Sequence, residues 1–185
     1  MKRQMTLAQT RAWCAVMHGD QKYGDLDYSF HLDAVEAVAV RFGFKRCTAI
    51  RKTCQAHDLI EDRGVTRLLL RSNGFSSIQA NAIWSVSDEP GATRMERKHK
   101  TLPKTRANRR GTVVKLCDRI ANLERQLAEG NRSKHKMYRR EHAYFQLMLR
   151  HPKESDIRVK RMWLHIDQLL AQGAVQFNLP LLKAA

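Results

Sequence analysis

Apolar residues recur every three or four positions along most of this chain, the spacing that places them on one face of an α-helix. Thr6 is suited to cap the first of these segments, and Gly43 is suited to end the second. There is no β-hairpin signature, so the pattern predicts an all-α fold. The predicted helices cover residues 6–18, 31–42, 48–60, 65–72, 76–87, 111–128, 132–150 and 155–172.

Polar segments separate the predicted helices. Residues 19–30 carry two glycines and three aspartates and are expected to form a loop, and residues 88–93 are expected to form a turn. Residues 94–109 are strongly basic, and Pro103 is expected to interrupt any helix there because proline has no amide hydrogen to donate. No internal repeat or low-complexity segment divides the chain, so residues 1–185 are predicted to form a single domain.

The composition is that of a globular protein, with 43% hydrophobic and 28% charged residues. No apolar run is long enough to cross a membrane, and the N-terminus lacks the apolar segment and cleavage site of a signal peptide. The cysteines lie in apolar, helix-like segments without the spacing of a zinc site, which predicts reduced thiols in a cytoplasmic protein. They are Cys14, Cys47, Cys54 and Cys117.

The chain carries a formal net charge of +16, with an isoelectric point near 10.2. The charge alone leaves two explanations open. Lysine and arginine side chains would neutralise the phosphates of a nucleic acid. Alternatively, a basic surface would draw a small polyanionic substrate toward a binding site. The most basic segments are residues 94–110 and 132–140.

The segment from Gln55 to Asp62 brings together side chains that bind metal ions and transfer protons. On a continuous helix, His57 and Glu61 lie four residues apart on one face. Asp58 and Asp62 have the same spacing. Several carboxylates are costly to bury together unless a cation lies among them. Because a His-Asp pair alone is common on solvent-exposed helix edges, the metal hypothesis depends on ligands elsewhere in the chain.

Two distant positions supply such ligands. His31 opens a predicted helix directly after the acidic loop. Asp118 lies amid the apolar face of another helix, and an aspartate in such a place is usually paired or bound to metal. Asn122, one turn later, is placed to reach the same pocket. The apolar residues around Asp118 are Val113, Val114, Leu116, Cys117, Ile120 and Leu123.

The order of these residues resembles that of a known family. The set His31, His57-Asp58 and Asp118 is similar to the ligand set of the HD superfamily of metal-dependent phosphohydrolases. More narrowly, residues 8–127 resemble the hydrolase domain of the Rel/SpoT alarmone enzymes and the free-standing small alarmone hydrolases.

Two motifs carry the closer resemblance. The HDxxED motif of the family is complete over residues 57–62, and its KLADxxxNL motif appears as KLCDRIANL over residues 115–123. Residues 18–31 approximate the loop that precedes the first ligand histidine of the family. The resemblance implies an HD-domain helical bundle as the core, with C-terminal helices over residues 132–172 added to it.

The resemblance also implies an activity and a cofactor. Enzymes of this family remove the 3′-pyrophosphate from (p)ppGpp, usually with manganese, and Zn²⁺, Fe²⁺ or Co²⁺ would also suit a mixed nitrogen and oxygen ligand set. Glu61 and Asp62 lie within one turn of the ligands, so one is expected to accept the proton of the attacking water and the other to orient it. The implied metal ligands are His31, His57, Asp58 and Asp118.

Four further residues are implied to contact the substrate. Lys22 and Lys98 are expected to bind the pyrophosphate, and Tyr28 and Asn122 are expected to contact the nucleoside. The loop departs from the family pattern, since Asp27 replaces the proline before the family tyrosine and the loop is about one residue shorter; Leu32 also replaces the proline that usually follows the first ligand histidine. This departure motivates a second hypothesis, in which the HD chemistry acts on a nucleoside mono- or triphosphate. A third hypothesis, motivated by the net charge, is a nucleic-acid-binding protein on an HD scaffold.

Overall fold

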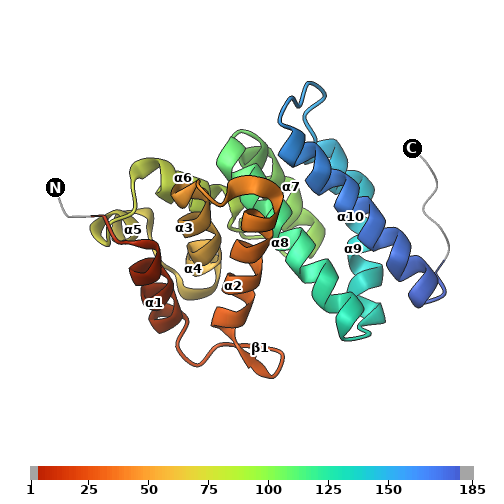
Figure 1. Ribbon diagram of the computed structural model, residues 1–185, viewed down its shortest axis with the longest axis horizontal. Helices are drawn as coiled ribbons and strands as arrows, with labels where there is room; N and C mark the ends of the chain where they lie inside the picture. Colours follow the sequence, from red (N-terminus) through yellow and green to blue (C-terminus); the bar gives the residue numbers. More distant parts are fainter. Residues whose placement is uncertain (1–3, 180–185) are drawn as a thin grey trace.

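The computed structural model in Figure 1 describes residues 4–179 and consists of α-helices with one small β-hairpin. The strands β1 (Lys22–Tyr23) and β2 (Leu26–Asp27) pair antiparallel. A short π-helix, η1, extends the second α-helix. The all-α prediction is confirmed. The helices are α1 (Leu7–His18), α2 (Tyr28–Ala39), η1 (Val40–Phe44), α3 (Thr48–Ala56), α4 (Leu59–Arg63), α5 (Arg67–Ser72), α6 (Ser77–Val86), α7 (Arg94–Arg106), α8 (Arg109–Ala128), α9 (Arg132–Leu149) and α10 (Ile157–Gln176).

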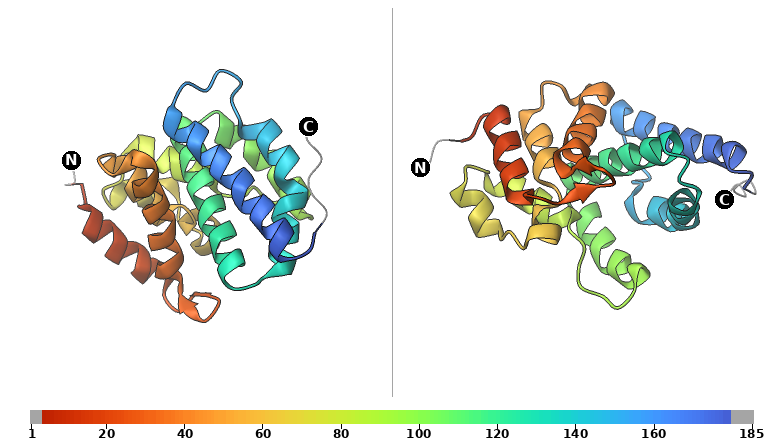
Figure 2. Two further views of the ribbon diagram at one scale, coloured as in Figure 1. Left: turned by 45° about the vertical axis from the view of Figure 1, so that its right-hand side comes forward. Right: turned by 90° about the horizontal axis from the view of Figure 1, so that it is seen from below.

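Helix α8 is the centre of the arrangement. It packs against α2, α3 and α6 and also against α7, α9 and α10. In Figures 1 and 2 it lies between the N-terminal helices and the pair formed by α9 and α10. Its predicted apolar face is buried throughout, as such a central position requires. The buried residues of that face are Val113, Val114, Leu116, Cys117, Ile120 and Leu123.

Two groups of buried side chains fill the interior. The larger group surrounds α8 and includes Phe145 and Trp163 of the C-terminal helices. The smaller group joins α1 through α6 and includes Leu32, Leu59 and Ile83. Each such side chain contributes roughly 1.5–3 kcal/mol of burial free energy. None of the described helices has the length and apolar character needed to cross a membrane.

The expected loop over residues 19–30 contains more structure than predicted. It forms the β1–β2 hairpin, in which Gly24 adopts a positive φ of 64°, a conformation that glycine adopts without strain. Tyr28 then begins α2, three residues before the predicted start. The prediction of no hairpin is wrong, because strands of two residues are too short to produce an alternating pattern.

Two predicted helix boundaries also differ from the structure. The helix predicted over residues 48–60 is broken, since α3 ends at Ala56 and α4 begins at Leu59. Conversely, Pro103 does not interrupt α7. Pro103 is exposed to solvent, so water can bond the carbonyl that the missing proline amide leaves free.

Candidate metal centre and active site

Three parts of the fold bring the predicted metal ligands together. His31 lies in the first turn of α2, His57 and Asp58 lie in the turn between α3 and α4, and Asp118 lies midway along α8. Adjacent side chains on a continuous helix diverge by about 100°. Because the chain turns at His57 and Asp58, both of these neighbouring side chains face the same point as His31.

Two ring nitrogens and two carboxylate oxygens meet at that point. His31 Nε2 lies 3.5 Å from Asp58 Oδ2 and 3.4 Å from Asp118 Oδ1. His57 Nε2 lies 2.9 Å from Asp58 Oδ2 and 3.8 Å from Asp118 Oδ1. The ligand atoms of His31, His57 and Asp118 all lie within 4.8 Å of one another, and both histidines are buried. The structure therefore brings all four predicted ligands together.

A backbone carbonyl orients the His57 ring through the nitrogen that faces away from the cluster. Its Nδ1 lies 2.8 Å from the carbonyl oxygen of Cys54, which only accepts hydrogen bonds, so Nδ1 carries the proton. This contact lies where the chain leaves α3, directly after Ala56. Within residues 4–179, the buried Nε2 of His57 lies 2.9 Å from Asp58 Oδ2 but in a geometry that does not form a hydrogen bond. A cation among the two imidazoles and two carboxylates would satisfy this atom, so the cluster is able to hold a metal ion.

The charges of the cluster favour a cation at the same point. Burial disfavours the charged imidazolium of His57, yet Asp58 and Asp118 outweigh burial and raise its pKa well above the ordinary value. Burial alone would raise the pKa of each aspartate, but the histidines hold both values well below the ordinary range. Metal ions bind in place of protons at such histidines.

In this structure, two of the predicted substrate contacts bond the carboxylates of predicted metal ligands. The Tyr28 hydroxyl donates to Asp58 Oδ2 at 2.6 Å. The Asn122 amide donates to Asp118 Oδ1 at 2.5 Å, and its oxygen accepts from the Tyr23 hydroxyl at 2.8 Å. Hydrogen bonds of this kind orient the carboxylates toward the shared point.

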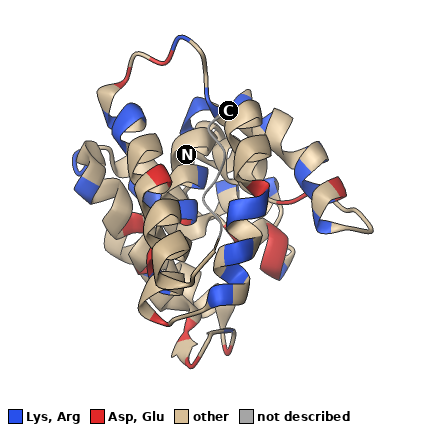
Figure 3. Cartoon of the chain, turned by 90° about the vertical axis from the view of Figure 1, so that its right-hand side faces the viewer, with Lys and Arg blue, Asp and Glu red and all other residues tan. Residues whose placement is uncertain are grey.

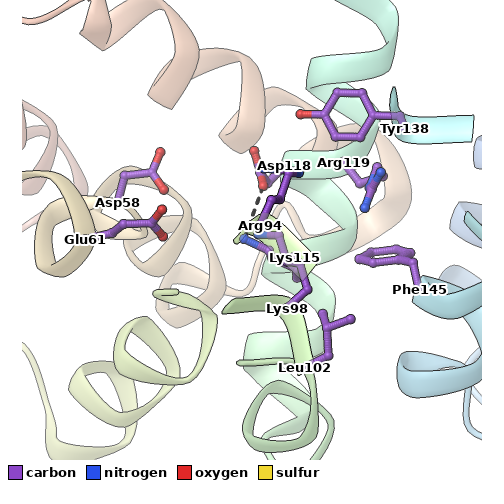
Figure 4. Close-up of a pocket in the computed structure, with 10 residues that line it drawn as sticks. All are labelled: Asp58, Glu61, Arg94, Lys98, Leu102, Lys115, Asp118, Arg119, Tyr138 and Phe145. Atoms are coloured by element: carbon purple, nitrogen blue, oxygen red, sulfur yellow. Dashed lines mark ion pairs between the residues drawn. The ribbon is translucent and has the colours of Figure 1, made fainter. Parts of the chain in front are cut away.

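A cavity of about 130 Å³ adjoins the cluster, and Figure 4 shows the residues that line it. Asp58, Glu61 and Asp118 line its acidic end. Tyr138 and Phe145 reach it from α9. The cavity thus has an acidic end and a cationic end. Helices α7 and α8 provide the basic residues of the cationic end. The basic residues that line the cationic end are Arg94, Lys98, Lys115 and Arg119.

The pKa values of the two cavity lysines are shifted in opposite directions. Lys115 Nζ lies 3.6 Å from Asp118 Oδ2, and although burial opposes the charge, the nearby carboxylates raise its pKa. Lys98 Nζ contacts both carboxylate oxygens of Asp88 at 2.8 Å. Burial and the charge of Lys115 nevertheless lower the pKa of Lys98 to about 8. Lys98 therefore loses its charge at mildly alkaline pH.

Arg119 completes the cationic end. Its guanidinium carbon lies 4.4 Å from the ring centre of Tyr138 and 4.2 Å from that of Phe145. Its Nη2 lies 3.6 Å from Glu141 Oε2, and Arg94 is paired with the same carboxylate. The buried Nη1 of Arg119 has no hydrogen-bond partner in the part of the chain that the structure describes. A buried unsatisfied donor is costly, and an anionic group in the cavity would satisfy it.

Glu61 and Asp62, the two acids at the end of the HDxxED segment, have different surroundings. Glu61 lines the cavity, and its Oε2 accepts from the backbone amide of Asp88 at 2.8 Å. Loss of surrounding water raises the pKa of Glu61, and the charge of Asp88 adds to this effect while Lys115 opposes it. Asp62 is not among the lining residues, and its Oδ2 accepts from the Gln21 amide at 2.6 Å.

The remaining predicted contact, Lys22, lies on the hairpin. Its exposed Nζ lies 2.5 Å from Asp27 Oδ1, and Lys22 does not line the cavity. Several cavity residues were absent from the prediction. Two of them, Lys115 and Arg119, lie on either side of Asp118 in the KLCDR segment, and basic residues so close to an acidic ligand could have been recognised in the sequence. Tyr138 and Phe145 of α9 belong to no motif that would have marked them as site residues. The unpredicted lining residues are Arg94, Leu102, Lys115, Arg119, Tyr138 and Phe145.

Comparison with known proteins supports the fold. The sequence matches no protein-family model and no curated protein. A solved structure, described as that of a metazoan ortholog of SpoT that hydrolyzes ppGpp and plays a role in starvation responses, matches with a TM-score of 0.59. The match covers 97% of this chain and 99% of that chain at 14% sequence identity. The chain has the fold of an HD-domain hydrolase.

The structural match covers more of the chain than the segment that carries the sequence motifs. Because the match covers nearly the whole chain, it includes the region of α9 and α10 as well as residues 8–127. In the HD fold of this protein, α9 supplies two side chains of the cavity wall. Helix α9 therefore helps to form the candidate site.

Proposed function

We propose that this protein is a metal-dependent phosphohydrolase that removes the 3′-pyrophosphate from (p)ppGpp. The observation that carries the proposal is the two-ended lining of one cavity, with a buried ligand cluster at one end and four basic side chains around the other. A substrate with several phosphates suits this division of charge. The HDxxED segment and the likeness to a SpoT ortholog favour (p)ppGpp among such substrates.

The four clustered side chains would hold one divalent cation. We propose Mn²⁺, with Zn²⁺, Fe²⁺ and Co²⁺ as alternatives for the same nitrogen and oxygen donors. When bound, such a cation supplies Lewis acidity to water and to a phosphoryl oxygen. Tyr28 and Asn122 act as positioning residues, because each bonds the carboxylate of a ligand. The ligands are His31, His57, Asp58 and Asp118.

Glu61 is the residue placed to accept the proton of the attacking water. It lies at the acidic end of the cavity, and its raised pKa brings it closer to neutral pH, where a general base is most effective. Asp62 is tied to Gln21, so it holds the segment before the hairpin against α4. The reaction consumes one water, and ppGpp yields GDP and pyrophosphate.

The cationic end would hold the phosphate charge that does not react. Lys98 and Arg119 each have donor capacity for an anion, since Lys98 is paired with one carboxylate and Arg119 retains an unsatisfied donor. Because the basic side chains of the cavity suit phosphate groups, the nucleoside is assigned to the side of the hairpin, near Tyr28 and Asn122.

One observation favours a second candidate substrate. Lys22, expected from the family resemblance to bind the pyrophosphate, is paired with Asp27 on the hairpin and lies outside the cavity lining. Without this cation, the remaining basic residues do not distinguish a 3′-pyrophosphate from phosphates at the 5′ position. A nucleoside mono- or triphosphate is therefore the alternative.

A hydrolysis assay with Mn²⁺ distinguishes these candidates. The full chain is incubated with ppGpp, pppGpp, GTP, dGTP and GMP, beside Asp58→Ala and the control Asp167→Asn, whose side chain contacts His142 away from the cavity. Release of GDP from ppGpp by the wild type and the control, but not by Asp58→Ala, supports the proposal. Cleavage of GTP or GMP instead favours the second candidate. No cleavage of any nucleotide overturns both.

A further inference from the structure

The positive charge of this chain is concentrated in one stretch. Residues 94–161 contain 21 of the 34 Lys and Arg but 7 of the 18 Asp and Glu, so they carry +14 of the net +16. Only four of these cations line the cavity. Figure 3 looks onto the side of the molecule that α9 and α10 form, where blue segments recur along the helices. A small substrate does not account for so many cations outside its site.

The outer face of α9 carries a row of these cations, Arg132, Lys136 and Arg140, termed here the α9 strip. All three are exposed and successive members lie four residues apart, on one face of the helix. Like charges at this spacing repel and destabilise a helix. Among residues 4–179, no carboxylate forms an ion pair with any of the three.

The acidic residue of α9 does not compensate the strip. Glu141 is the one acidic residue in the sequence of α9, and it is turned toward the cavity, where it pairs with Arg94 and Arg119. The repulsion within the strip is therefore not offset by the fold, and an external polyanion would offset it.

The basic surface continues beyond the strip at one end of α9. Arg106 Nη1 lies 3.5 Å from the carbonyl oxygen of Leu147, which places the corner between α7 and α8 beside the last turn of α9. Arg110 belongs to this corner and Arg150 directly follows α9, and both are exposed. Cations thus extend from the first turn of α9 past its last turn.

We propose that the α9 strip, with this corner, binds the phosphate backbone of a nucleic acid. Exposed cations along the first half of α9, and again at the corner beside its last turn, match a repeating anion, and binding would release the condensed counterions of that polyanion. An anionic membrane surface fits less well, because the apolar face of α9 is buried in the core through Phe145 and Leu149. The surface lies outside the cavity, so this inference is independent of the proposed hydrolase activity.

The test compares two variants that remove the same charge. Lys136→Gln/Arg140→Gln removes the middle and end of the strip, and Arg63→Gln/Arg71→Gln removes two exposed arginines from the region of α4 and α5. Binding of the full chain to labelled duplex DNA and single-stranded RNA is measured by anisotropy between about 50 and 200 mM salt. On DNA, the strip variant is expected to lower the slope of log K against log salt by about 2, since each phosphate contact contributes about 0.9. The control variant keeps the wild-type slope.

Three further measurements make the test decisive. The swap Lys136→Arg/Arg140→Lys retains the charges and is expected to retain binding. Absence of binding at low salt, or equal losses in the strip and control variants, overturns the proposal. Binding to vesicles containing phosphatidylserine without binding to nucleic acid also overturns it. Nucleotide hydrolysis by the strip variant is expected to equal that of the wild type. A wild type that binds nucleic acid but hydrolyses no nucleotide would therefore contradict the hydrolase proposal alone.

Discussion

The two ends of the cavity are held in different ways. At the acidic end, three of the four predicted ligands are held by a hydrogen bond: Tyr28 bonds Asp58, Asn122 bonds Asp118, and a backbone carbonyl bonds His57. Among the described residues, the buried Nδ1 of the fourth, His31, has no hydrogen-bond partner. At the cationic end, one glutamate serves both arginines, one guanidinium donor is unsatisfied and one lysine has a lowered pKa. The acidic end is therefore preorganised for a fixed ion, whereas the cationic end is completed by an anionic ligand.

The largest effect is expected from breaking the acidic end. Asp118→Ala removes a carboxylate that faces both histidines, so the cation loses a ligand and the imidazoles lose their counter-charge. We expect kcat for nucleotide hydrolysis to fall by about 10²- to 10³-fold, as when a group that stabilises the transition state is removed. The measurement is kcat at saturating Mn²⁺, with a circular dichroism spectrum to show that the variant is folded. Activity within tenfold of the wild type would contradict the assignment of Asp118.

A smaller effect is expected at the cationic end. Lys98→Gln removes a buried charge that faces the cavity, and a charge-assisted hydrogen bond is worth roughly 1.5–3 kcal/mol. We expect kcat/KM to fall about 10- to 100-fold, while Mn²⁺ affinity stays unchanged. Lys100→Gln, on the same helix but exposed and paired with Glu96, is the matched control. An equal loss in both variants would show that the overall charge of α7, and not the cavity, is responsible.

The hydrogen bonds that hold the ligand carboxylates give a third comparison. Tyr28→Phe removes only the hydroxyl that bonds Asp58, and the loss of such a bond costs about 10- to 100-fold in metal affinity. We expect weaker Mn²⁺ binding with kcat largely recovered at high Mn²⁺. Titration of activity against Mn²⁺ measures this directly. A lowered kcat that added Mn²⁺ does not restore would instead give Tyr28 a direct role at the substrate.

The smallest effect is a dependence on pH. Because the pKa of Lys98 is lowered to about 8, its charge is present below this pH and is lost as the pH rises through it. We expect kcat/KM to fall by a few-fold above about pH 8 as this cation is lost. Lys98→Arg should remove the fall, since arginine keeps its charge throughout this range. The same alkaline fall in Lys98→Arg would assign it to another group.

The sequence predicted the residues of the acidic end but not their local geometry. The HDxxED segment and the apolar face around Asp118 depend on residue type and spacing, which are visible in the sequence. The break between α3 and α4 falls at His57 and Asp58, within a segment whose apolar spacing continues, so no periodic pattern reports it. The α9 residues of the cavity were not predicted, because α7 and α9 come together through packing between helices distant in the chain.

Manganese binding by the full chain tests the central claim most directly. After treatment with a chelator, the protein is titrated with Mn²⁺ and followed by electron paramagnetic resonance, with His57→Ala and the distant His151→Ala as a matched pair. The account predicts a single tight site with nitrogen coupling from histidine, retained in His151→Ala and lost in His57→Ala. Absence of a tight site in the wild type, or an unchanged site in His57→Ala, would contradict it.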